Sequence, residues 1–537
     1  MSCLLDPIRL RKALRHEGGL SRRLFLAQAA ALAALPRLAA AAGASAVTHR
    51  FADDPFRLGI ASGDPSPDGV VLWTRLCPHP LQADPGMPPT PVRVDWEIAE
   101  NESMGRGRRK GTVLAMPQLG HSVHVEVAGL RPDRTYWYRF HAGGATSPVG
   151  RTRTLPPPGS EPDRMRFAFV SCQNWEQGLF TAYDHLAVQD LDFVVHLGDY
   201  IYEGEPSDNK VRKHLGPAVG RIQTLSDYRL RHAQYRSDPL LQRAHARFPW
   251  WVTWDDHEFD NNYADGIPDT NGLDPADFLV RRAAAYQAYY EAMPLRASCL
   301  PQGPSMRLYR SMRFGRLAEF QFLDTRQYRT DQPNQDGRKP LNRAARNPAN
   351  SLLGTEQRGW LDRNLLASEA TWNVLAQQVM MGIVAYPPPP ESHEPVYSMD
   401  QWPGAVHERM AMARFWRDRR VPNPVVLTGD IHSNWVNDLR VDDRDPASAV
   451  VAAEFVGTSI SSGGNGSLAA DDLAKLQREN AGVRFFSRER GYVRCEVSPG
   501  RWRSDYVAVE EVTRPGGTGV VRRSFGIEAG RAGISPA

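Results

Sequence analysis

Residues 193–203 of this chain read Phe193-Val194-Val195-His196-Leu197-Gly198-Asp199-Tyr200-Ile201-Tyr202-Glu203. The first five form a short, mainly apolar run, which is typical of a strand buried on both faces of a parallel sheet. Gly198 gives the backbone room, and Asp199 stands at the end of the strand, where its carboxylate could bridge two cations. Tyr202 reaches the same centre if the chain turns into a helix. The segment therefore predicts an α/β fold with a metal site at a strand end.

Three more groups of ligand-type residues follow apolar runs along the chain. Open α/β sheets place their sites just beyond the carboxyl ends of the strands, so all four groups are expected to meet. Further strands are expected at 320–323 and 372–375, and a helix near 176–190. The three groups are Ser171-Cys172-Gln173 after the run 167–170, Trp254-Asp255-Asp256-His257-Glu258-Phe259-Asp260-Asn261-Asn262, and Thr428-Gly429-Asp430-Ile431-His432-Ser433-Asn434-Trp435 after the run 425–427.

The types of residue in these groups indicate metal binding. Carboxylate and amide oxygens suit calcium, magnesium or manganese, whereas Cys, Tyr and His suit ferric iron or zinc. Taken alone, Asp199 would be read as a helix N-cap, Cys172 as a buried thiol and Tyr202 as a core aromatic side chain. The joint pattern of four clusters at strand ends favours a metal centre over these separate explanations.

At 537 residues the chain exceeds what one hydrophobic core usually serves, which predicts two domains plus processing segments. Residues 50–155 contain short alternating runs separated by Gly, Pro and Asp, a pattern typical of a small β-sandwich. The stiff segment Pro156-Pro157-Pro158-Gly159 marks a boundary. Residues 160–537 are expected to form the catalytic domain, with the Gly-rich tail after residue 515 either a lid over the site or a frayed end.

Residues 1–46 have the organisation of an export signal. A basic stretch is followed by Arg22-Arg23 and an Ala/Leu-rich run, and Ala44-Ser45-Ala46 resembles a cleavage site. Because Pro36 and Arg37 interrupt the apolar run, it is too short to span a bilayer. We interpret the segment as a cleaved twin-arginine signal rather than a tail with two accidental arginines. It predicts the twin-arginine export machinery as a partner, no transmembrane segment in the mature chain, and a periplasmic or secreted location.

The net charge of +4 is small for a chain of this length. This balance indicates no specific nucleic-acid recognition and no membrane surface. The five cysteines, at positions 3, 77, 172, 299 and 495, include no CxxC pair. At most two disulfides are therefore expected in the mature chain, and the alternative for each cysteine is a buried thiol.

As a set, the four motifs resemble those of PhoD-like alkaline phosphatases, within the calcineurin-like metallophosphoesterase superfamily. The resemblance covers essentially the whole mature chain, including Ala61-Ser62-Gly63-Asp64-Pro65 and Leu323-Asp324-Thr325-Arg326-Gln327-Tyr328-Arg329. It implies an α/β fold with a four-layer αββα metallophosphoesterase domain. Gly129-Leu130-Arg131-Pro132-Asp133 resembles the turn into a late strand of fibronectin type III-like domains, which implies a small β-sandwich of that kind in front.

The resemblance also implies a site that holds ferric iron, Fe3+, together with calcium ions, Ca2+. The implied iron ligands are Cys172, Asp199, Tyr202 and His432. The implied calcium ligands are Asp199, Asp256, Asn262 and Asp430, with Asn261 nearly as good a candidate as Asn262. Ser171-Cys172-Gln173 stands where the superfamily usually has Asp-x-His, a departure typical of the PhoD-like branch that favours iron over a zinc or manganese pair.

In a site of this kind the cations offset the charge that builds up on the phosphoryl group, and a water activated by them attacks in line. His257 is placed to protonate the leaving oxygen or to hold a phosphate oxygen. Arg326 is expected to grip the phosphate bidentately, with Arg329 as second choice. The competing interpretations are a structural, salt-bridged His257, a simple turn at residues 261–262, and an Arg326 that pairs with Asp324 or a neighbouring acid.

The sequence therefore predicts an exported, metal-dependent alkaline phosphatase or phosphodiesterase acting on small-molecule or polymeric phosphate esters. One alternative is a dedicated phosphodiesterase or phospholipase D-like enzyme, which parallel assays of monoesters and diesters would identify. A second is a non-catalytic exported phosphate-binding protein, which would bind metal and phosphate without turnover. A third is a secreted oxidoreductase, which a redox assay would detect.

Overall fold

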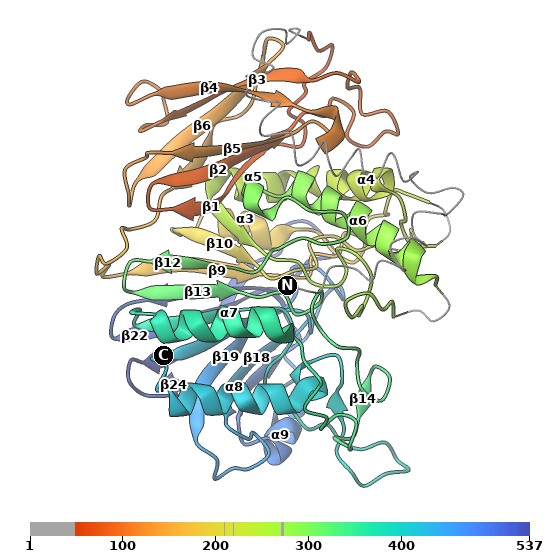
Figure 1. Cartoon of the computed structure of the whole chain (residues 1–537), viewed down its shortest axis with the longest axis vertical. Helices are drawn as coiled ribbons and strands as arrows, with labels where there is room; N and C mark the ends of the chain where they lie inside the picture. The colour runs from red at the N-terminus through yellow and green to blue at the C-terminus, as the bar shows by residue number, and fades with distance from the viewer. Residues whose placement is uncertain (1–48, 209, 218–219, 270–272, 537) are drawn as a thin grey trace.

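The computed structural model of the chain describes residues 49–208, 210–217, 220–269 and 273–536. The predicted signal at residues 1–46 lies outside the described residues. Two large sheets and the helices that cover them form most of the molecule (Figure 1). Among the described helices, none is long and apolar enough to cross a membrane.

The first sheet has ten strands. In spatial order they are β24 (Ser535–Pro536), β23 (Gly519–Glu528), β22 (Arg501–Val509), β21 (Arg490–Val497), β9 (Met165–Val170), β10 (Phe193–His196), β11 (Pro249–Val252), β1 (Ile60–Ser66), β2 (Gly69–Arg75) and β5 (Ser122–Ala128). Its centre is parallel, because the four consecutive strands β9, β10, β11 and β1 pair in parallel with one another. The carboxyl ends of these strands therefore lie along one edge of the sheet.

The second sheet has seven strands and also a parallel centre, β13-β15-β17-β19. In spatial order the strands are β12 (Arg310–Phe314), β13 (Ala318–Phe322), β15 (Trp372–Ala376), β17 (Pro424–Thr428), β19 (Val450–Val456), β18 (Asn434–Arg440) and β20 (Val483–Ser487). The apolar runs at 167–170, 193–197, 320–323, 372–375 and 425–427 all contain strands, as predicted. A small two-stranded sheet pairs β14 (Arg338–Lys339) with β16 (Tyr397–Ser398).

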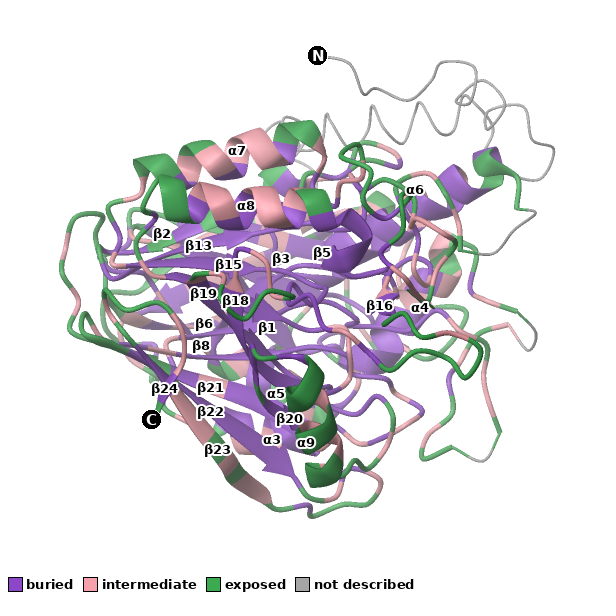
Figure 2. Ribbon diagram, turned by 90° about the horizontal axis from the view of Figure 1, so that it is seen from below, coloured by how far each residue is buried: buried purple, intermediate pink, exposed green. Residues whose placement is uncertain are grey.

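The two sheets pack face to face, and helices cover their outer faces. Phe167, Phe320 and Trp372 belong to the core between the sheets. The ten-stranded sheet is covered by α3 (Thr181–Ala187), α4 (Leu225–Arg236), α5 (Pro239–Arg247) and α6 (Pro275–Ala292), and the seven-stranded sheet by α7 (Gly354–Ala367) and α8 (Val406–Asp418). The order helix, sheet, sheet, helix confirms the predicted αββα architecture. Figure 2 shows the buried strands between α7 and α8 on one side and the ten-stranded sheet on the other, with α9 (Ala470–Glu479) largely exposed.

Two of the covering helices begin at signals that the sequence encodes directly. Asp238 precedes Pro239 at the start of α5, and Asp274 precedes Pro275 at the start of α6. Each aspartate accepts a hydrogen bond from a backbone N–H in the first turn of its helix. Because proline lacks an N–H and has its φ fixed near the helical value, it fits the first helical position without loss.

The N-terminal segment forms the predicted β-sandwich. One of its sheets contains β3 (Val92–Ala99), β4 (Arg109–Ala115), β6 (Thr135–Ala142), β7 (Ala145–Thr146) and β8 (Gly150–Arg153). The other consists of β1, β2 and β5, which also belong to the ten-stranded sheet, and Val70, Val94 and Tyr138 are among the side chains packed between the two. The sandwich and the catalytic sheet are therefore joined by strand pairing, at Ser62↔Pro249 and Gly63↔Trp250.

The Gly-rich tail differs from the expected lid or frayed end. β23 pairs with β22 from Arg501↔Glu528 to Val509↔Gly519, and β24 pairs with β23. The ladder satisfies the backbone N–H and C=O groups of the tail, which explains why this sequence is ordered as the edge of a sheet despite its glycines.

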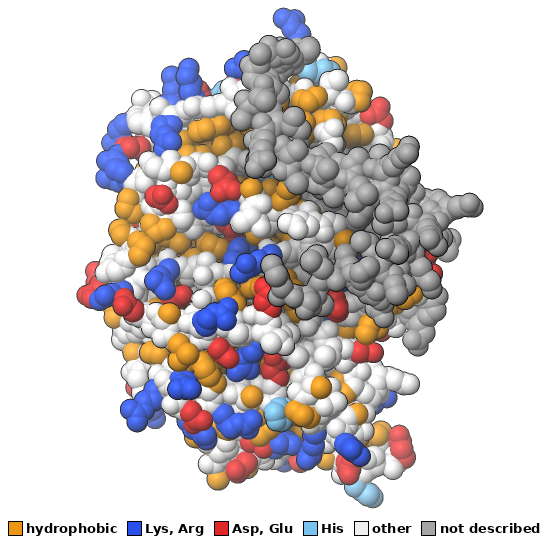
Figure 3. All heavy atoms as spheres, viewed as in Figure 1, with side chains coloured by type: hydrophobic (Ala, Val, Ile, Leu, Met, Phe, Trp, Pro, Cys, Tyr) orange, Lys and Arg blue, Asp and Glu red, His pale blue; other side chains and the backbone are white. Residues whose placement is uncertain are grey.

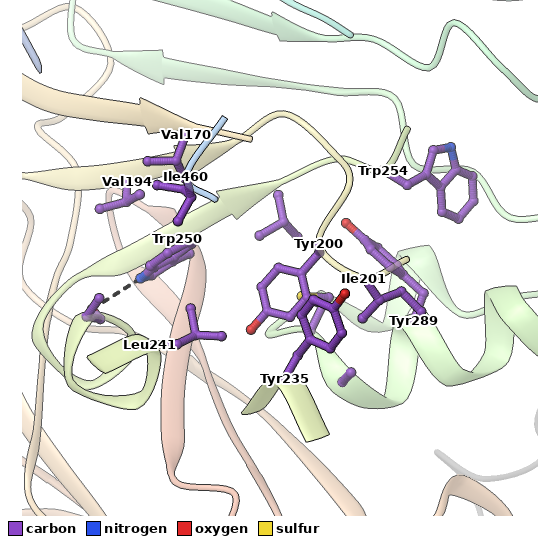
Figure 4. Packing of buried hydrophobic residues seen from close by; sticks show 14 of the residues in the cluster. Val170, Val194, Tyr200, Ile201, Tyr235, Leu241, Trp250, Trp254, Tyr289 and Ile460 are labelled. Atoms are coloured by element: carbon purple, nitrogen blue, oxygen red, sulfur yellow. Dashed lines mark hydrogen bonds between the residues drawn. The ribbon is translucent and has the colours of Figure 1, made fainter. Parts of the chain in front are cut away.

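A buried aromatic cluster supports the turn that follows β10. Tyr200 and Ile201, the two residues after Asp199, are at most 1% exposed and lie in the cluster that also contains Trp250 and Tyr235 (Figure 4). Trp250 donates a hydrogen bond from its indole N–H to the carbonyl of Ala244 at 3.3 Å. Because large aromatic side chains bury much apolar area, this packing fixes the direction of the turn.

Charged side chains of both signs are interspersed on the face of the molecule seen in Figure 3. The described part of that face carries no continuous basic stripe, in keeping with the small net charge of +4.

Candidate metal centre

The carboxyl ends of parallel strands bring together the four groups that the sequence singled out. Cys172 follows β9, Asp199 follows β10 and Asp256 follows β11, whereas Asp430 and His432 follow β17 of the other sheet. Three sets of described residues each have ligand atoms that all lie within 4.8 Å of one another. These sets are Cys172, Asp199 and His432; Asp199, Asp256 and His257; and Asp255, Asp256 and Asp430.

Five of the predicted ligands adopt a left-handed backbone conformation. The φ angle is 59° at Cys172, 57° at Asp199, 48° at Asn262, 64° at Asp430 and 53° at His432. Residues other than glycine rarely adopt this conformation, which costs about 1–2 kcal/mol each. Such strain persists only where the surrounding structure enforces it, and it concentrates at functional sites.

Tyr202 joins the first set through hydrogen bonds. Its hydroxyl donates to Asp199 Oδ2 at 2.8 Å and lies 3.0 Å from His432 Nε2. Ser462 Oγ in turn donates to the Tyr202 hydroxyl at 2.7 Å. The chain does not turn into a helix after Asp199, since residues 200–204 form an irregular loop. Tyr202 reaches the centre instead because buried Arg231 donates to its carbonyl and holds the loop in place.

Arg326 lies inside the acidic part of the centre. It is fully buried, and its guanidinium donates through Nε to Asp255, through Nη1 to Asp400 at 2.8 Å and through Nη2 to Asp430 at 3.2 Å. Arg329 also contacts Asp400, at 2.9 Å. The arginine is thus engaged by carboxylates, which differs from the expected grip on phosphate. The competing interpretation, a pair with Asp324 or a neighbouring acid, describes the guanidinium better, although the acids are Asp255, Asp400 and Asp430 rather than Asp324.

Asn261 and Asn262 differ in their hydrogen-bond partners. The backbone N–H of Asn262 donates to Asp256 Oδ2 at 2.7 Å, which places Asn262 against a candidate ligand. The side-chain amide of Asn261 donates instead to Asp269 at 3.1 Å, and its backbone N–H donates to Glu203 at 3.0 Å. This geometry favours Asn262 over Asn261 as a neighbour of the metal centre.

His257 stands at the rim of the centre. Its Nδ1 lies 2.7 Å from Glu203 Oε2, and its side chain is 21% exposed. Its ring centroid lies 4.2 Å from that of Tyr202. Although burial lowers the pKa of His257, the carboxylates of Glu203, Asp199 and Asp256 raise it well above the ordinary value. The imidazolium form is therefore favoured in this setting, and its pair with Glu203 is the contact that the salt-bridged interpretation expected.

The raised pKa values of several candidate ligands indicate that the centre lacks positive charge. Burial and the charge of Asp199 raise the pKa values of Cys172 and Tyr202 well above their ordinary range. Burial, followed by the neighbouring carboxylates, raises the pKa of Asp430 to about 7 despite Arg326. Cys172 and Tyr202 are therefore favoured in their neutral forms unless a cation approaches.

The hydrogen bonding of three carboxylate oxygens also indicates that the centre lacks positive charge. One oxygen each of Asp199, Asp255 and Asp256 is buried and has no hydrogen-bond partner among the described residues. An unpaired buried carboxylate oxygen is costly, and a bound cation removes that cost while lowering the pKa values of its ligands. The residues of this centre therefore fit a metal site. Arg326 pairs with Asp255, Asp256 and Asp430 but with no member of the set Cys172, Asp199 and His432.

Several residues that support the centre were given no role of their own from the sequence. Glu258 accepts hydrogen bonds from the backbone N–H groups of Asp199, Tyr200 and Asp255. Ser462 follows β19, so the rule of looking beyond the ends of parallel strands would have found it. Asp400 follows no strand of the main sheets, and no local signal in the sequence distinguishes it.

The cysteines carry no disulfide in the described part of the chain. Cys77, Cys172, Cys299 and Cys495 are all free and buried. The buried-thiol interpretation therefore holds, and no disulfide competes for Cys172.

Comparison with known proteins matches this arrangement to one family. Residues 167–506 match the model of the PhoD-like phosphatase family, and residues 40–156 match the model of its N-terminal domain. This chain belongs to the PhoD-like phosphatase family. It is 50% identical over 523 residues to alkaline phosphatase D of Bacillus subtilis (strain 168), covering 96% of this chain and 88% of that protein. A solved structure described as the structure of PhoD has a TM-score of 0.87 and 50% identity, and the match covers 91% of this chain and 94% of that one.

Membership of the PhoD-like phosphatase family confirms the resemblance that the motifs carried. It also fits the fold, because the N-terminal family model ends at residue 156 and the phosphatase model begins at residue 167 with the first strand of the αββα layers. The metal centre lies within the residues matched by the phosphatase model.

Proposed function

We propose that this protein hydrolyses phosphate esters with the help of metal ions bound at the centre described above. The single observation that supports this most strongly is the pair of buried carboxylate oxygens, one each of Asp199 and Asp255, that have neither a hydrogen-bond nor an ion-pair partner among the described residues. When bound, the ions supply an activated water at working pH and offset the charge of the phosphoryl group. Membership of a phosphatase family supports the same reaction class.

The donor types support ferric iron and calcium as the two kinds of ion. Cys172, Asp199, Tyr202 and His432 would hold iron, because thiolate, phenolate and imidazole ligands suit it. The calcium side consists of oxygen donors, which are the ligands that calcium prefers. These are Asp199, Asp256, Asn262 and Asp430.

His257 is proposed to protonate the leaving oxygen or to hold a phosphate oxygen. Glu203 orients its ring through Nδ1, which leaves Nε2 for the substrate. The carboxylates around it keep the imidazolium form available despite burial. Arg326 was expected to grip the phosphate. Its contacts with Asp255, Asp400 and Asp430 support instead a role in holding the acidic ligands in place.

The substrates are proposed to be phosphomonoesters, phosphodiesters or both, as small molecules or as parts of polymers. Export is proposed from the Arg22-Arg23 motif and the Ala44-Ser45-Ala46 cleavage site. The mature protein would be periplasmic or secreted, with a sandwich domain at 50–155 and a catalytic domain at 160–537.

The test is to purify the mature chain, to measure its iron, calcium, zinc and manganese, and to assay a monoester and a diester on the same sample. Cys172→Ala and Asp199→Ala should abolish hydrolysis and lose metal. Cys77→Ala, which removes an equally buried thiol remote from the centre, serves as the matched control and should retain both. Zinc or manganese with an active Cys172→Ala would overturn the iron assignment. Metal and phosphate binding without turnover would overturn the enzymatic function.

A further inference from the structure

A cavity of about 320 Å³ opens directly beside the metal centre. His432, a candidate iron ligand, lines it together with its neighbours Ile431 and Ser433. A volume of this size accommodates a small organic group, since small-molecule sites begin at about 300 Å³. Any group attached to a phosphate at the centre therefore has a place to enter on this side.

The wall of the cavity is aromatic. Trp435, Phe486 and Tyr386 line it and belong to one apolar cluster. The ring centroids of Trp435 and Phe486 lie 4.5 Å apart. Leu476 of α9 also lines the cavity and packs against the same cluster, so the exposed helix forms the outer wall. A flat or apolar group suits such a surface better than a hydrated sugar or polyol chain.

The charges at the cavity are not evenly matched. Asp472 is shared by Arg488, at 2.9 Å, and Lys475, at 4.0 Å, which leaves little of its charge for a ligand. Arg338 makes no ion pair with any carboxylate of the described chain. Its guanidinium carbon lies 3.8 Å from the centre of the Tyr386 ring, a cation–π contact that holds the group in one orientation. A guanidinium fixed in this way is suited to bind a carboxylate or phosphate through two donors.

We propose that this cavity binds the organic group next to the scissile phosphate, and that it selects a flat ring that carries a second negative charge, which Arg338 recognises. The inference rests on the proposed phosphoesterase function and specifies its substrate class. Glu479 also lines the cavity, and its charge opposes the proposed preference.

The test uses three phosphodiesters of 4-nitrophenol that differ only in the second alcohol: methanol, benzyl alcohol and 4-carboxybenzyl alcohol. The bond broken and the leaving group are the same in all three, so differences in kcat/KM report binding of the second group. The wild-type order is expected to be 4-carboxybenzyl, then benzyl, then methyl. Arg338→Gln should lower kcat/KM for the 4-carboxybenzyl ester about tenfold, the effect of losing one charged hydrogen-bond pair, and should leave the methyl ester within about twofold.

Two further variants sharpen the result. Arg417→Gln, an exposed arginine of α8 paired with Asp418, is the matched control and should change none of the three esters. Glu479→Gln should raise kcat/KM for the 4-carboxybenzyl ester, and a fall would indicate a cationic group in the cavity and overturn the proposal. Equal rates for the three esters in the wild type, or an equal loss for all three in Arg338→Gln, would also overturn it.

Hydrolysis of the monoester 4-nitrophenyl phosphate is measured alongside. If only that monoester is cleaved, the cavity proposal fails and the phosphatase function stands, whereas no hydrolysis at all refutes both.

Discussion

Replacing Glu258 with Gln removes the acceptor that fixes the turn around Asp199. The carboxylate accepts the N–H of Asp199 at 3.1 Å and that of Asp255 at 2.8 Å, and also the N–H of Tyr200. An amide offers only one acceptor oxygen, and its NH2 group would face a donor. At least one buried N–H then loses its partner, at a cost of about 1–3 kcal/mol. We expect the free energy of unfolding to fall by about 2 kcal/mol.

The same substitution should weaken metal binding, although Glu258 is a positioning residue that contacts none of the reacting atoms. Asp199 belongs to two of the three ligand sets, and its left-handed conformation depends on its anchored N–H. Loss of an outer hydrogen bond of this kind lowers metal affinity about tenfold or more. The assay combines thermal unfolding with elemental analysis of metal content after dialysis against a metal buffer.

Glu408→Gln is the control for this prediction. Glu408 lies on α8, away from the centre, and accepts the N–H of Leu352 at 2.7 Å and the hydroxyl of Ser351 at 3.0 Å. It should lower the unfolding temperature and leave metal content unchanged. If Glu258→Gln loses no more metal than Glu408→Gln, or leaves the unfolding temperature as it was, then the reasoning from the three N–H contacts is refuted.

Three other predictions concern proton donation, domain joining and acid stability. His257→Asn should lower kcat by about 10²–10⁴-fold for alkyl esters, and by much less for 4-nitrophenyl esters, whose leaving group needs no proton; equal losses would contradict the proposed acid. Asp64→Ala removes the carboxylate that Arg310 contacts at 2.7 Å, so it should cost about 3–5 kcal/mol in a denaturant titration without loss of metal. Burial lowers the pKa of His232 to about 3 in the folded protein, whereas its pKa in the unfolded chain is about 6.5. The contribution of His232 to the free energy of unfolding is therefore complete above a pH of about 6.5 and is lost as the pH falls toward 3. Because neither ring nitrogen has a partner in the described structure, His232→Phe should flatten the dependence of stability on pH in that window, and an unchanged slope would count against the burial argument.

The sequence was sufficient to predict the strands and the convergence of most candidate ligand residues, because both depend on local patterns. Apolar runs such as 193–197 and 425–427 are short, continuous and followed at once by polar residues, which is the signature of a buried parallel strand. Convergence of Cys172, Asp199 and His432 then follows from the rule for strand ends. Tyr202 reaches the centre without the helical turn on which the expectation depended, because the loop is held by the distant side chain of Arg231, which no local pattern reveals.

The roles of Arg326 and the tail depended on contacts between distant segments. Arg326 meets Asp400, which is 74 residues away in the sequence, and its burial among carboxylates could not be read from its immediate neighbours. The tail beyond residue 515 is rich in glycine, which suggested disorder or a lid. Its order comes from pairing with β22, a long-range ladder that composition does not encode.

The placement of charge suggests how the two sheets cooperate at the centre. Cys172, Asp199 and Asp256 come from the ten-stranded sheet, and Asp430 and His432 from the seven-stranded sheet, so the acidic groups of the two halves repel across their common edge. Arg326, on the loop after β13, offsets that repulsion for the set that contains Asp255 and Asp430. At the set that contains Cys172, Asp199 and His432, Arg490 donates to the backbone carbonyl of His432 at 2.6 Å, and no ion pair between an arginine or lysine and Asp199 is found in the described part of the chain. A cation bound there would join the two sheets as well as activate water, because its ligands come from both. The strained backbone of these ligands is consistent with a site that the packing of both sheets holds in place before any ion binds.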